Sequence, residues 1–374
     1  MQVFTKIGSF IDKIYYRVFP SCDTEKKLGL TPYDAQNDNA SDDPEIKDLR
    51  DMDDESFLKR VKPDLDILES LREIKFKTYK LRKKLAVPVC AVLLPITGYI
   101  DYLLLWLQRG SDDGAAGLTV LIAGGIYWWV TQPKREYARA YKETILPKLA
   151  KVFGNFTFKI DGKIPMESLK PSQIMPSHDS YNSEDYFQGV YKGVEIEFSE
   201  IHLTEQQGSG KNRRTVTKFK GLAVLLKMQR KKFLGHTTLE RNSSSIGEWF
   251  RQKSFSLKKA RMADPEFEKL FDVYTNDQVE ARYLVDPLMI ENLKALYDEY
   301  SGKGMIAAWY ESQMLVLVSS DHNHFEPASI KIPATDPQSV LNMKREIGQI
   351  LSIIDRLDLF DPRAVEDEKQ AIPA

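Results

Sequence analysis

The chain has 374 residues and carries 53 Lys and Arg against 54 Asp and Glu, which gives a net charge of −1. This balance excludes the strong overall positive field that is typical of nucleic-acid-binding proteins, and we expect no nucleic-acid partner. The length predicts about two domains beside any membrane segment. The two cysteines, Cys22 in a polar region and Cys90 in an apolar stretch, are not expected to pair, which favours a reducing compartment.

Residues 1–20 are predicted to form an amphipathic helix. Apolar residues recur there at helical spacing, namely Val3, Phe4, Ile7, Phe10, Ile11, Ile14, Tyr15 and Val18. Two placements stay open for this helix, on anionic lipid or on the protein's own body. The segment lacks a continuous apolar core, so we expect no cleavable signal peptide. Residues 21–63 are acidic and polar and predict a loose linker, because such a run cannot bury a core.

Residues 64–131 are predicted to lead into the membrane and to fold back within it. A cytoplasmic helix over 64–84 presents an apolar stripe whose partner is either the C-terminal domain or a second subunit. Two apolar stretches follow, at residues 85–107 and 115–130. A helix needs about 20 apolar residues to cross a bilayer core of about 30 Å. Residues 85–131 therefore predict a two-helix transmembrane hairpin, with a juxtamembrane helix over 132–152.

The orientation of this hairpin follows from the cations beside it. They are Lys75, Lys77, Lys80, Arg82, Lys83 and Lys84 before it and Lys134, Arg135, Arg139 and Lys142 after it. The link between the stretches carries Arg109 alone, with Asp112 and Asp113. Because Lys and Arg near membrane ends stay in the cytoplasm, we expect a two-span protein of the cytoplasmic (inner) membrane with both termini cytoplasmic. Trp128 and Trp129 predict an aromatic anchor at the cytoplasmic face.

Four residues within the hairpin are candidates for membrane-helix packing. Ala115, Thr119 and Ala123 follow one another at four-residue spacing, which lets helix backbones approach closely. Asp101 stands in an apolar stretch, where a carboxylate costs about 2.5–3.5 kcal/mol at the bilayer centre. Two interpretations of Asp101 are open: it snorkels or is protonated, or it makes a polar contact within an oligomer or along an ion path.

Residues 153–362 predict a cytoplasmic α+β domain of antiparallel sheet plus helices, followed by a tail at 363–374. Strand patterns cover residues 153–160, 189–203, 216–227, 233–239, 305–310 and 314–319. The second pattern folds back at Lys192-Gly193, the fourth is expected to pair with the third, and the last two form a hairpin that turns at residues 311–313. Strands and helices do not alternate regularly, which favours α+β over a doubly wound sheet.

Three helices of this domain are predicted from one signal, an acidic cap before a proline at the first helical position. The signal occurs at Asp264-Pro265, Asp286-Pro287 and Asp336-Pro337. The apolar stripes that follow are Phe267, Leu270, Phe271 and Tyr274, then Leu288, Leu293, Leu296, Tyr297 and Tyr300, and then Val340, Ile347, Ile350, Leu351, Ile354 and Leu357.

Two stretches here carry a family likeness: residues 264–274 read DPEFEKLFDVY and residues 277–284 read DQVEARYL. They resemble the signature of bacterial domain-of-unknown-function family 3137. The short motifs Phe219-Lys220-Gly221-Leu222 and Phe325-Glu326-Pro327 are similar to further motifs of that family. The resemblance covers roughly residues 60–360. It implies a bacterial cytoplasmic-membrane protein with a membrane hairpin and a cytosolic domain, and it implies no activity and no catalytic residues.

No catalytic residue, metal site or cofactor is predicted. The run Gly208-Ser209-Gly210-Lys211 lacks the spacing of a phosphate-binding loop and joins two strand patterns, so we expect a hairpin tip. His322 and His324 share a face of an extended segment, as zinc ligands do, but no third ligand is identifiable nearby. We therefore expect a solvent-exposed loop there.

Two groups of polar residues are interaction candidates instead. Asp277, Gln278, Glu280, Arg282 and Tyr283 gather in the segment between two predicted helices. Either Glu280 and Arg282 pair to fix this joint, or the five residues form a recognition surface. The lipid-facing basic candidates are Lys218, Lys220, Arg230, Lys231 and Lys232, because each cation beside anionic lipid contributes about 1 kcal/mol of binding.

The sequence therefore predicts a membrane-anchored cytoplasmic interaction or scaffold protein. The expected partners are membrane lipid and either a second copy of the chain or another membrane-associated protein. Two alternatives are a membrane-bound enzyme acting on a lipid or nucleotide, with Asp277, Glu280, Arg282 or the two histidines in its site, and a small oligomeric pore around Asp101.

Overall fold

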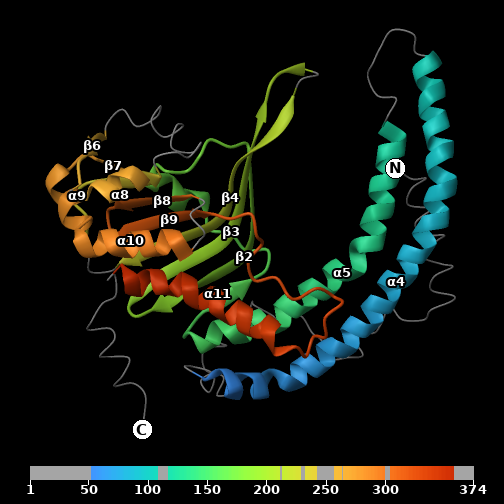
Figure 1. Cartoon of the computed structure of the whole chain (residues 1–374), viewed down its shortest axis with the longest axis horizontal. Helices are drawn as coiled ribbons and strands as arrows, with labels where there is room; N and C mark the ends of the chain where they lie inside the picture. The colour runs from blue at the N-terminus through green and yellow to red at the C-terminus, as the bar shows by residue number, and fades with distance from the viewer. Residues whose placement is uncertain are drawn as a thin grey trace. The chain divides into compact units, whose positions relative to one another are not determined.

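The computed structural model describes residues 52–107, 117–210, 213–228, 232–241, 257–262, 264–299 and 304–357 (Figure 1). The predictions for residues 1–20, for most of 21–63 and for the tail lie outside the described residues. The chain divides into two compact units, each described here by itself. Among the described residues, the first unit holds 60–107, 117–144 and 328–336, and the second holds the rest.

Two long helices, α4 (Asp54–Leu107) and α5 (Gly117–Val152), run antiparallel beside each other (Figure 1). Each is continuous, so the predicted helix at 64–84 and the first apolar stretch form one element. The linker prediction is wrong for residues 54–63, which are helical. Asp53 Oδ2 accepts the amide hydrogen of Ser56 at 3.2 Å, and Phe57 and Val61 are buried. A cap and an apolar stripe thus begin the helix within the acidic run.

Among the described residues, α4 alone is long and apolar enough to cross a membrane. In its most apolar window only 11% of the residues are buried, unlike a core helix of a soluble protein. The described apolar part of α5 is too short to cross a membrane by the same measure, because it ends before Gln132, Pro133 and Lys134. The predicted two-helix hairpin is thus found as an antiparallel helix pair with one candidate span.

The described residues of the second unit form a nine-stranded sheet in which every neighbouring pair of strands is antiparallel. The order is β1-β2-β3-β4-β9-β8-β5-β7-β6. The strands are β1 (Thr157–Lys159), β2 (Ser180–Tyr191), β3 (Val194–Gln207), β4 (Arg214–Met228), β5 (Thr237–Arg241), β6 (Lys258–Ala260), β7 (Phe271–Thr275), β8 (Met305–Tyr310) and β9 (Gln313–Ser319). This arrangement confirms the α+β class.

The helices of this unit are short except for the last two. They are α6 (Met166–Leu169), α8 (Pro265–Leu270), α9 (Gln278–Leu284), α10 (Pro287–Glu299) and α11 (Pro337–Arg356), with a 3₁₀ turn η2 (Lys170–Ser172). Asp264 Oδ1 accepts the amide hydrogens of Glu266 and Phe267, and Asp286 Oδ1 accepts that of Met289. These bonds confirm two of the predicted acidic caps. All three prolines begin helices, and the predicted stripe of α11 is buried.

Apolar side chains cover both faces of the sheet. On one face, Ile201 and Leu225 pack in a cluster with Ile164 and Leu169 of the segment around α6. On the other face, the rings of Phe187 and Phe198 stack at 4.6 Å, and Phe325 lies against Phe187 at 5.1 Å. The alternation along β3 therefore serves two cores, because side chains of a strand point to opposite faces in turn.

The structure corrects two predictions about strands and one about a helix. Residues 153–160 form a strand only at Thr157–Lys159. The helix α8 stops at Leu270, so Phe271 and Tyr274 belong to β7 and not to a helical stripe. The strand β5 pairs with β7 and β8, whereas β4, its expected partner, lies between β3 and β9. The predicted hairpin turn at Lys192-Gly193 is confirmed, with positive φ at both residues (48° and 79°).

Gly221, in one of the family-like motifs, lies where β4 meets β9. Its φ is +151°, and a Cβ there would stand 2.0 Å from the carbonyl oxygen of Val318. Gly210 provides a contrast, since its φ is +57° and a Cβ would meet nothing within 4 Å. Of these two glycines, Gly221 alone combines a left-handed backbone with a close approach of a neighbouring strand.

We expect Gly221→Ala to lower the free energy of unfolding by roughly 2–6 kcal/mol, since it adds backbone strain and a steric clash. Gly210→Ala, which adds only the strained φ, should cost roughly 1–2 kcal/mol. Urea unfolding of the purified chain in detergent, followed by tryptophan fluorescence, measures both. Equal losses in the two variants would contradict the clash with Val318.

Candidate functional site

Arginine and tryptophan side chains connect α4 and α5 where the apolar parts of the two helices meet their cation-rich parts. Arg82 of α4 donates to the carbonyl oxygen of Trp129 (2.8 Å) and to Gln132 Oε1 (3.0 Å), and its guanidinium lies over the Trp129 ring. Arg135 of α5 donates to the carbonyl oxygen of Trp128 (3.0 Å) and lies over that ring. Aromatic and cationic groups at one level of a helix pair are typical of membrane–water interfaces.

Asp101 connects the two helices near their other end. Its Oδ2 accepts the amide hydrogen of Thr119 at 3.0 Å, and Thr119 Oγ1 donates to Thr97 Oγ1 at 3.2 Å. Thr119 lies in the first turn of α5, where amides have no helical partner and the helix dipole is positive. Asp101 therefore caps α5 from the neighbouring helix. Of the other packing candidates, Ala123 lies on α5, and Ala115 is outside the described residues.

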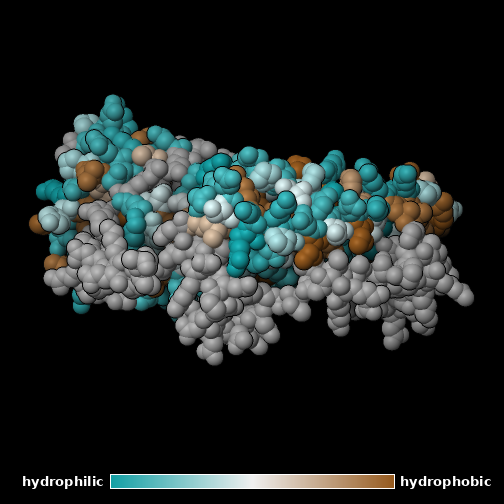
Figure 2. Space-filling model, turned by 90° about the horizontal axis from the view of Figure 1, so that it is seen from below, coloured by the Kyte–Doolittle hydropathy of each residue, from teal (hydrophilic) through white to brown (hydrophobic). Residues whose placement is uncertain are grey.

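Large apolar side chains are exposed along the apolar parts of both helices. They include Leu85, Val87, Val92, Ile96, Tyr99, Tyr102, Leu104, Trp106, Leu107, Val120, Leu121, Tyr127 and Trp128. In Figure 2, brown residues of this kind gather at the right end of the view. Burying one such side chain fully is worth about 1.5–3 kcal/mol, so this surface strongly favours an apolar environment over water.

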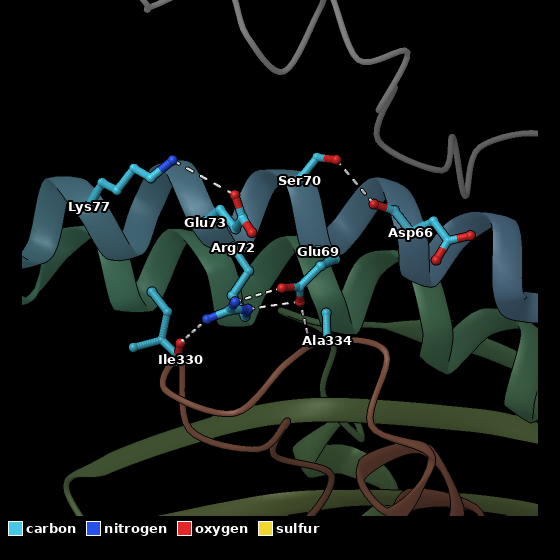
Figure 3. A network of polar contacts seen from close by, with 8 residues as sticks. All are labelled: Asp66, Glu69, Ser70, Arg72, Glu73, Lys77, Ile330 and Ala334. Atoms are coloured by element: carbon cyan, nitrogen blue, oxygen red, sulfur yellow. Dashed lines mark hydrogen bonds and ion pairs between the residues drawn. The ribbon is translucent and has the colours of Figure 1, made fainter.

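A bidentate ion pair on α4 binds the segment 328–336 of the same unit (Figure 3). Arg72 donates from Nε and Nη2 to the two carboxylate oxygens of Glu69 (2.8 and 2.5 Å). Arg72 Nη1 also donates to the carbonyl oxygen of Ile330 (2.8 Å), and the amide of Ala334 donates to Glu69 Oε2 (2.6 Å). The ion pair lowers the pKa of Glu69 and keeps it charged. The network thus holds residues 328–336 against α4 through backbone groups of that segment.

The interaction candidates of residues 277–283 form the helix α9, which the sequence analysis missed. Asp277 Oδ1 accepts the amide hydrogens of Val279 and Glu280, so it caps the helix. The two oxygens of Glu280 accept the amides of Leu234 and Gly235 at 2.6 and 2.5 Å. Of the two interpretations of this segment, the pairing of Glu280 with Arg282 is not found among the described residues. The signal for α9 was present in the sequence as an acidic cap followed three residues later by Glu280.

Two side chains of this segment are strongly exposed. Tyr283 is 85% exposed and Val279 is 80% exposed. They stand four residues apart and so share one face of α9. Arg282 lines a cleft of about 620 Å³ together with Arg261, Val285, Pro287, Ile290 and Lys294, among others. Gln278 is half-buried, and its Nε2 donates to the carbonyl oxygens of Lys258 and Lys259 at 3.4 and 3.5 Å. The structure thus separates the five candidates into three that contact the backbone, Asp277, Gln278 and Glu280, and two exposed side chains, Arg282 and Tyr283.

The lipid-facing basic candidates are only partly described. Lys218 forms an ion pair with Glu205 at 2.8 Å, and Lys220 donates to Asn323 Oδ1 at 2.9 Å. Lys232 is exposed, while Arg230 and Lys231 lie outside the described residues. Two of the five cations are therefore already engaged with other side chains of the sheet unit.

The histidine pair of the sequence analysis is held by local polar contacts. His324 Nε2 makes a hydrogen bond with Ser320 Oγ at 3.0 Å, and His322 is exposed. Burial and the neighbouring His322 lower the pKa of His324. In the part of the chain that the structure describes, no group of three or more His, Cys, Asp and Glu side chains is placed to hold a metal ion.

His236 is a second histidine that the protein surrounds, and the sequence analysis did not single it out. Its Nε2 makes a hydrogen bond with the carbonyl oxygen of Ser172 at 2.9 Å, and its ring stacks on Tyr310 at 5.7 Å. Burial lowers the pKa of His236, although the Ser172 carbonyl and the Glu311 charge oppose this shift. Neutral imidazole is therefore the form that the folded protein favours.

The described residues thus define an α+β protein with an exposed apolar helix pair and a cleft lined by arginine side chains. Residues 217–359 match the model of a family described as protein of unknown function (DUF3137). The match confirms the family resemblance predicted from the sequence. It covers most of β4 and continues through α11, including the cleft and Gly221, and it does not reach α4 or α5.

Two further comparisons add little. The comparison with curated proteins found no match. Among solved structures, the chain is similar to the crystal structure of the mycobacterial trehalose monomycolate transport factor A, TtfA, with 9% sequence identity and a TM-score of 0.28. The similarity covers 53% of this chain and 88% of that chain. A TM-score this low does not establish a shared fold.

Replacing Asp101 should loosen the helix pair. We expect Asp101→Leu to lower the free energy of unfolding by about 1–3 kcal/mol, because the half-buried amide of Thr119 loses its acceptor. Tyr102→Leu is the matched control, since Tyr102 is exposed beside it. Thermal unfolding of both variants in the same detergent tests this. Equal midpoints for the two variants would argue against the cap.

The stability of the sheet unit should decrease as the pH is lowered through the ordinary pKa of histidine. Because His236 and His324 have lowered pKa values, the unfolded chain takes up protons at about pH 6.5 before the folded chain does. Their contribution is complete above that pH and is lost as the pH falls below it. We expect the thermal midpoint to drop between about pH 7 and pH 5, and to drop less in His236→Gln/His324→Gln. Identical slopes would refute this origin.

Proposed function

We propose that this chain is a membrane-anchored interaction protein of the bacterial cytoplasmic (inner) membrane. In this proposal α4 and α5 form a transmembrane hairpin, both termini are cytoplasmic, and the sheet unit works in the cytoplasm. The observation that carries the proposal is the exposed apolar surface of α4, whose most apolar window is only 11% buried. A helix already satisfies its own backbone groups, so such a surface is suited to lipid.

Three further features support the membrane placement and its direction. Arg82 and Arg135 lie over tryptophan rings at one end of the helix pair, where an interfacial belt is expected. Asp101 is paired inside the hairpin, which reduces the cost of a carboxylate in lipid. Cations flank the hairpin on the side of both termini, whereas the short link holds Arg109 and two aspartates.

The interaction role rests on the sheet unit. Val279, Tyr283 and Leu234 are more than three-quarters exposed, although side chains of this size are usually at least partly covered. Exposed apolar residues gathered near arginine side chains are typical of protein–protein surfaces. The partner is a second copy of the chain or another membrane-associated protein, as expected from the sequence.

Cysteine labelling on intact cells tests the topology. In a Cys22→Ser/Cys90→Ser background, a single cysteine at Ser111, in the short link, should react with a membrane-impermeant maleimide. A single cysteine at Asn182, exposed on β2, should react only after the cells are lysed. The two positions serve as controls for each other, because both substitutions place a thiol at a polar site.

Two outcomes would refute the membrane placement. One is recovery of the full-length chain from the soluble fraction without detergent. The other is labelling of Asn182→Cys on intact cells, which would put the sheet unit outside the cytoplasm. Protection of Ser111→Cys in intact cells, with labelling after lysis, would show that the link does not reach the outer face.

A further inference from the structure

The cleft beside α9 has the size and lining of a binding site. Its volume of about 620 Å³ falls within the range of about 300–1,000 Å³ that ligand sites occupy. Arg261 follows β6, Arg282 comes from α9, and Pro287 and Ile290 come from the start of α10. Val285 and Ile290 are almost fully buried and supply an apolar floor. Residues distant in sequence thus contribute cations and apolar surface to one recess.

The acidic groups of the cleft are largely engaged by the protein itself. Asp264 accepts Lys294 Nζ at 2.5 Å and also caps α8, and Asp286 caps α10 through the amide of Met289 at 2.7 Å. The pairing with Lys294 and the cap lower the pKa of Asp264, which keeps its carboxylate charged. Asp264 is therefore already paired with a cation of the cleft, and Asp286 is held in place as a helix cap.

The two arginine side chains of the cleft have no such partners. Neither Arg261 nor Arg282 makes a hydrogen bond or ion pair with any residue that the structure describes, and within the same set Glu291 is the one acid of the cleft without a partner. Two unpaired guanidinium groups thus remain in the recess, together with the carboxylates of Glu291 and of the capping Asp286. A guanidinium matches the planar geometry of a carboxylate with two parallel hydrogen bonds, so each of these arginine side chains can still bind a carboxylate of a ligand.

Exposed apolar side chains occur on the two helices that contribute to the cleft, close in sequence to the residues that line it. Tyr283 follows Arg282 directly and is 85% exposed, and Leu288 follows Pro287 and is 59% exposed. Val279 lies one turn before Tyr283 on the same face of α9. Tyrosine and arginine are the residue types that most often dominate the binding energy of protein interfaces. We call Val279, Tyr283 and Leu288 the rim, because α9 and α10 carry them within a few residues of the cleft-lining Arg282 and Pro287.

We infer that the cleft and its rim bind an acidic peptide segment of a partner protein. Carboxylates of the peptide pair with Arg261 and Arg282, and an adjacent apolar side chain packs on Tyr283 and Leu288. This inference rests on the proposed interaction function and names the chemistry of its partner. A peptide fits better than a bilayer surface, because the guanidinium groups line a recess that a side chain can enter and a flat surface cannot.

A peptide selection on the intact protein tests the inference. Phage-displayed random dodecapeptides are selected on the full-length chain in lipid nanodiscs, and enriched peptides are labelled for fluorescence anisotropy. We expect enrichment of Asp or Glu next to Leu, Phe, Tyr or Trp. Arg282→Gln and Arg261→Gln should each weaken binding about tenfold, and Tyr283→Ala should weaken it as well. Arg213→Gln, which changes an exposed arginine in the β3–β4 turn, should leave binding unchanged.

The contrary outcomes are distinct. Absence of any enriched peptide, or equal binding by Arg261→Gln, Arg282→Gln and the parent chain, overturns the inference. Displacement of the peptide by equal concentrations of inorganic phosphate or soluble short-chain phosphatidylglycerol also overturns it, because it assigns the cleft to a phosphate or a headgroup. Cysteine labelling judges the membrane placement separately, so a membrane-inserted chain that selects no peptide loses only this inference.

Discussion

The exposed apolar surface of α4 is the constraint on which the other features of the helix pair depend. Each large apolar side chain gains about 1.5–3 kcal/mol when it is fully buried, and many of them lie along residues 85–107. Among the described residues, few protein atoms cover this stretch, as its 11% buried share indicates. A polar group in such a stretch needs a partner on its own helix or on the adjacent one, because the neighbouring apolar side chains offer none.

The polar groups of the helix pair meet this requirement. Asp101 reaches the first turn of α5 through the amide of Thr119, and Arg82 reaches the last apolar turn of α5 through the carbonyl oxygen of Trp129. Both contacts use backbone groups of the other helix, so they fix its position along the pair and not only its distance. A carboxylate that looks misplaced in the sequence is thus one end of a two-point connection between α4 and α5.

Local signals predicted much of the sheet unit, and their failures have a common cause. The caps at Asp264 and Asp286 and the turn at Lys192-Gly193 depend on neighbouring residues alone, and the structure has all three. Phe271 and Tyr274 fit helical spacing after Phe267, yet Phe271–Thr275 also alternates as a strand does. Pairing with β5 selects the strand over the helix for Phe271–Thr275. Because β5 lies about thirty residues earlier in the chain, no local pattern contains this information.

The candidate site shows the same limit more sharply. Pairing of Glu280 with Arg282 is one of the two interpretations that the sequence allows, but Glu280 instead accepts two amides from residues 45 or more positions earlier. Glu280 and Arg282 stand two residues apart on α9, and side chains at that spacing do not face each other on a helix. Arg282 is thus left available to the cleft, where β6 and its pairing with β7 bring the segment ending in Arg261. The arginine pair therefore results from long-range pairing, and no spacing within residues 277–283 could have predicted it.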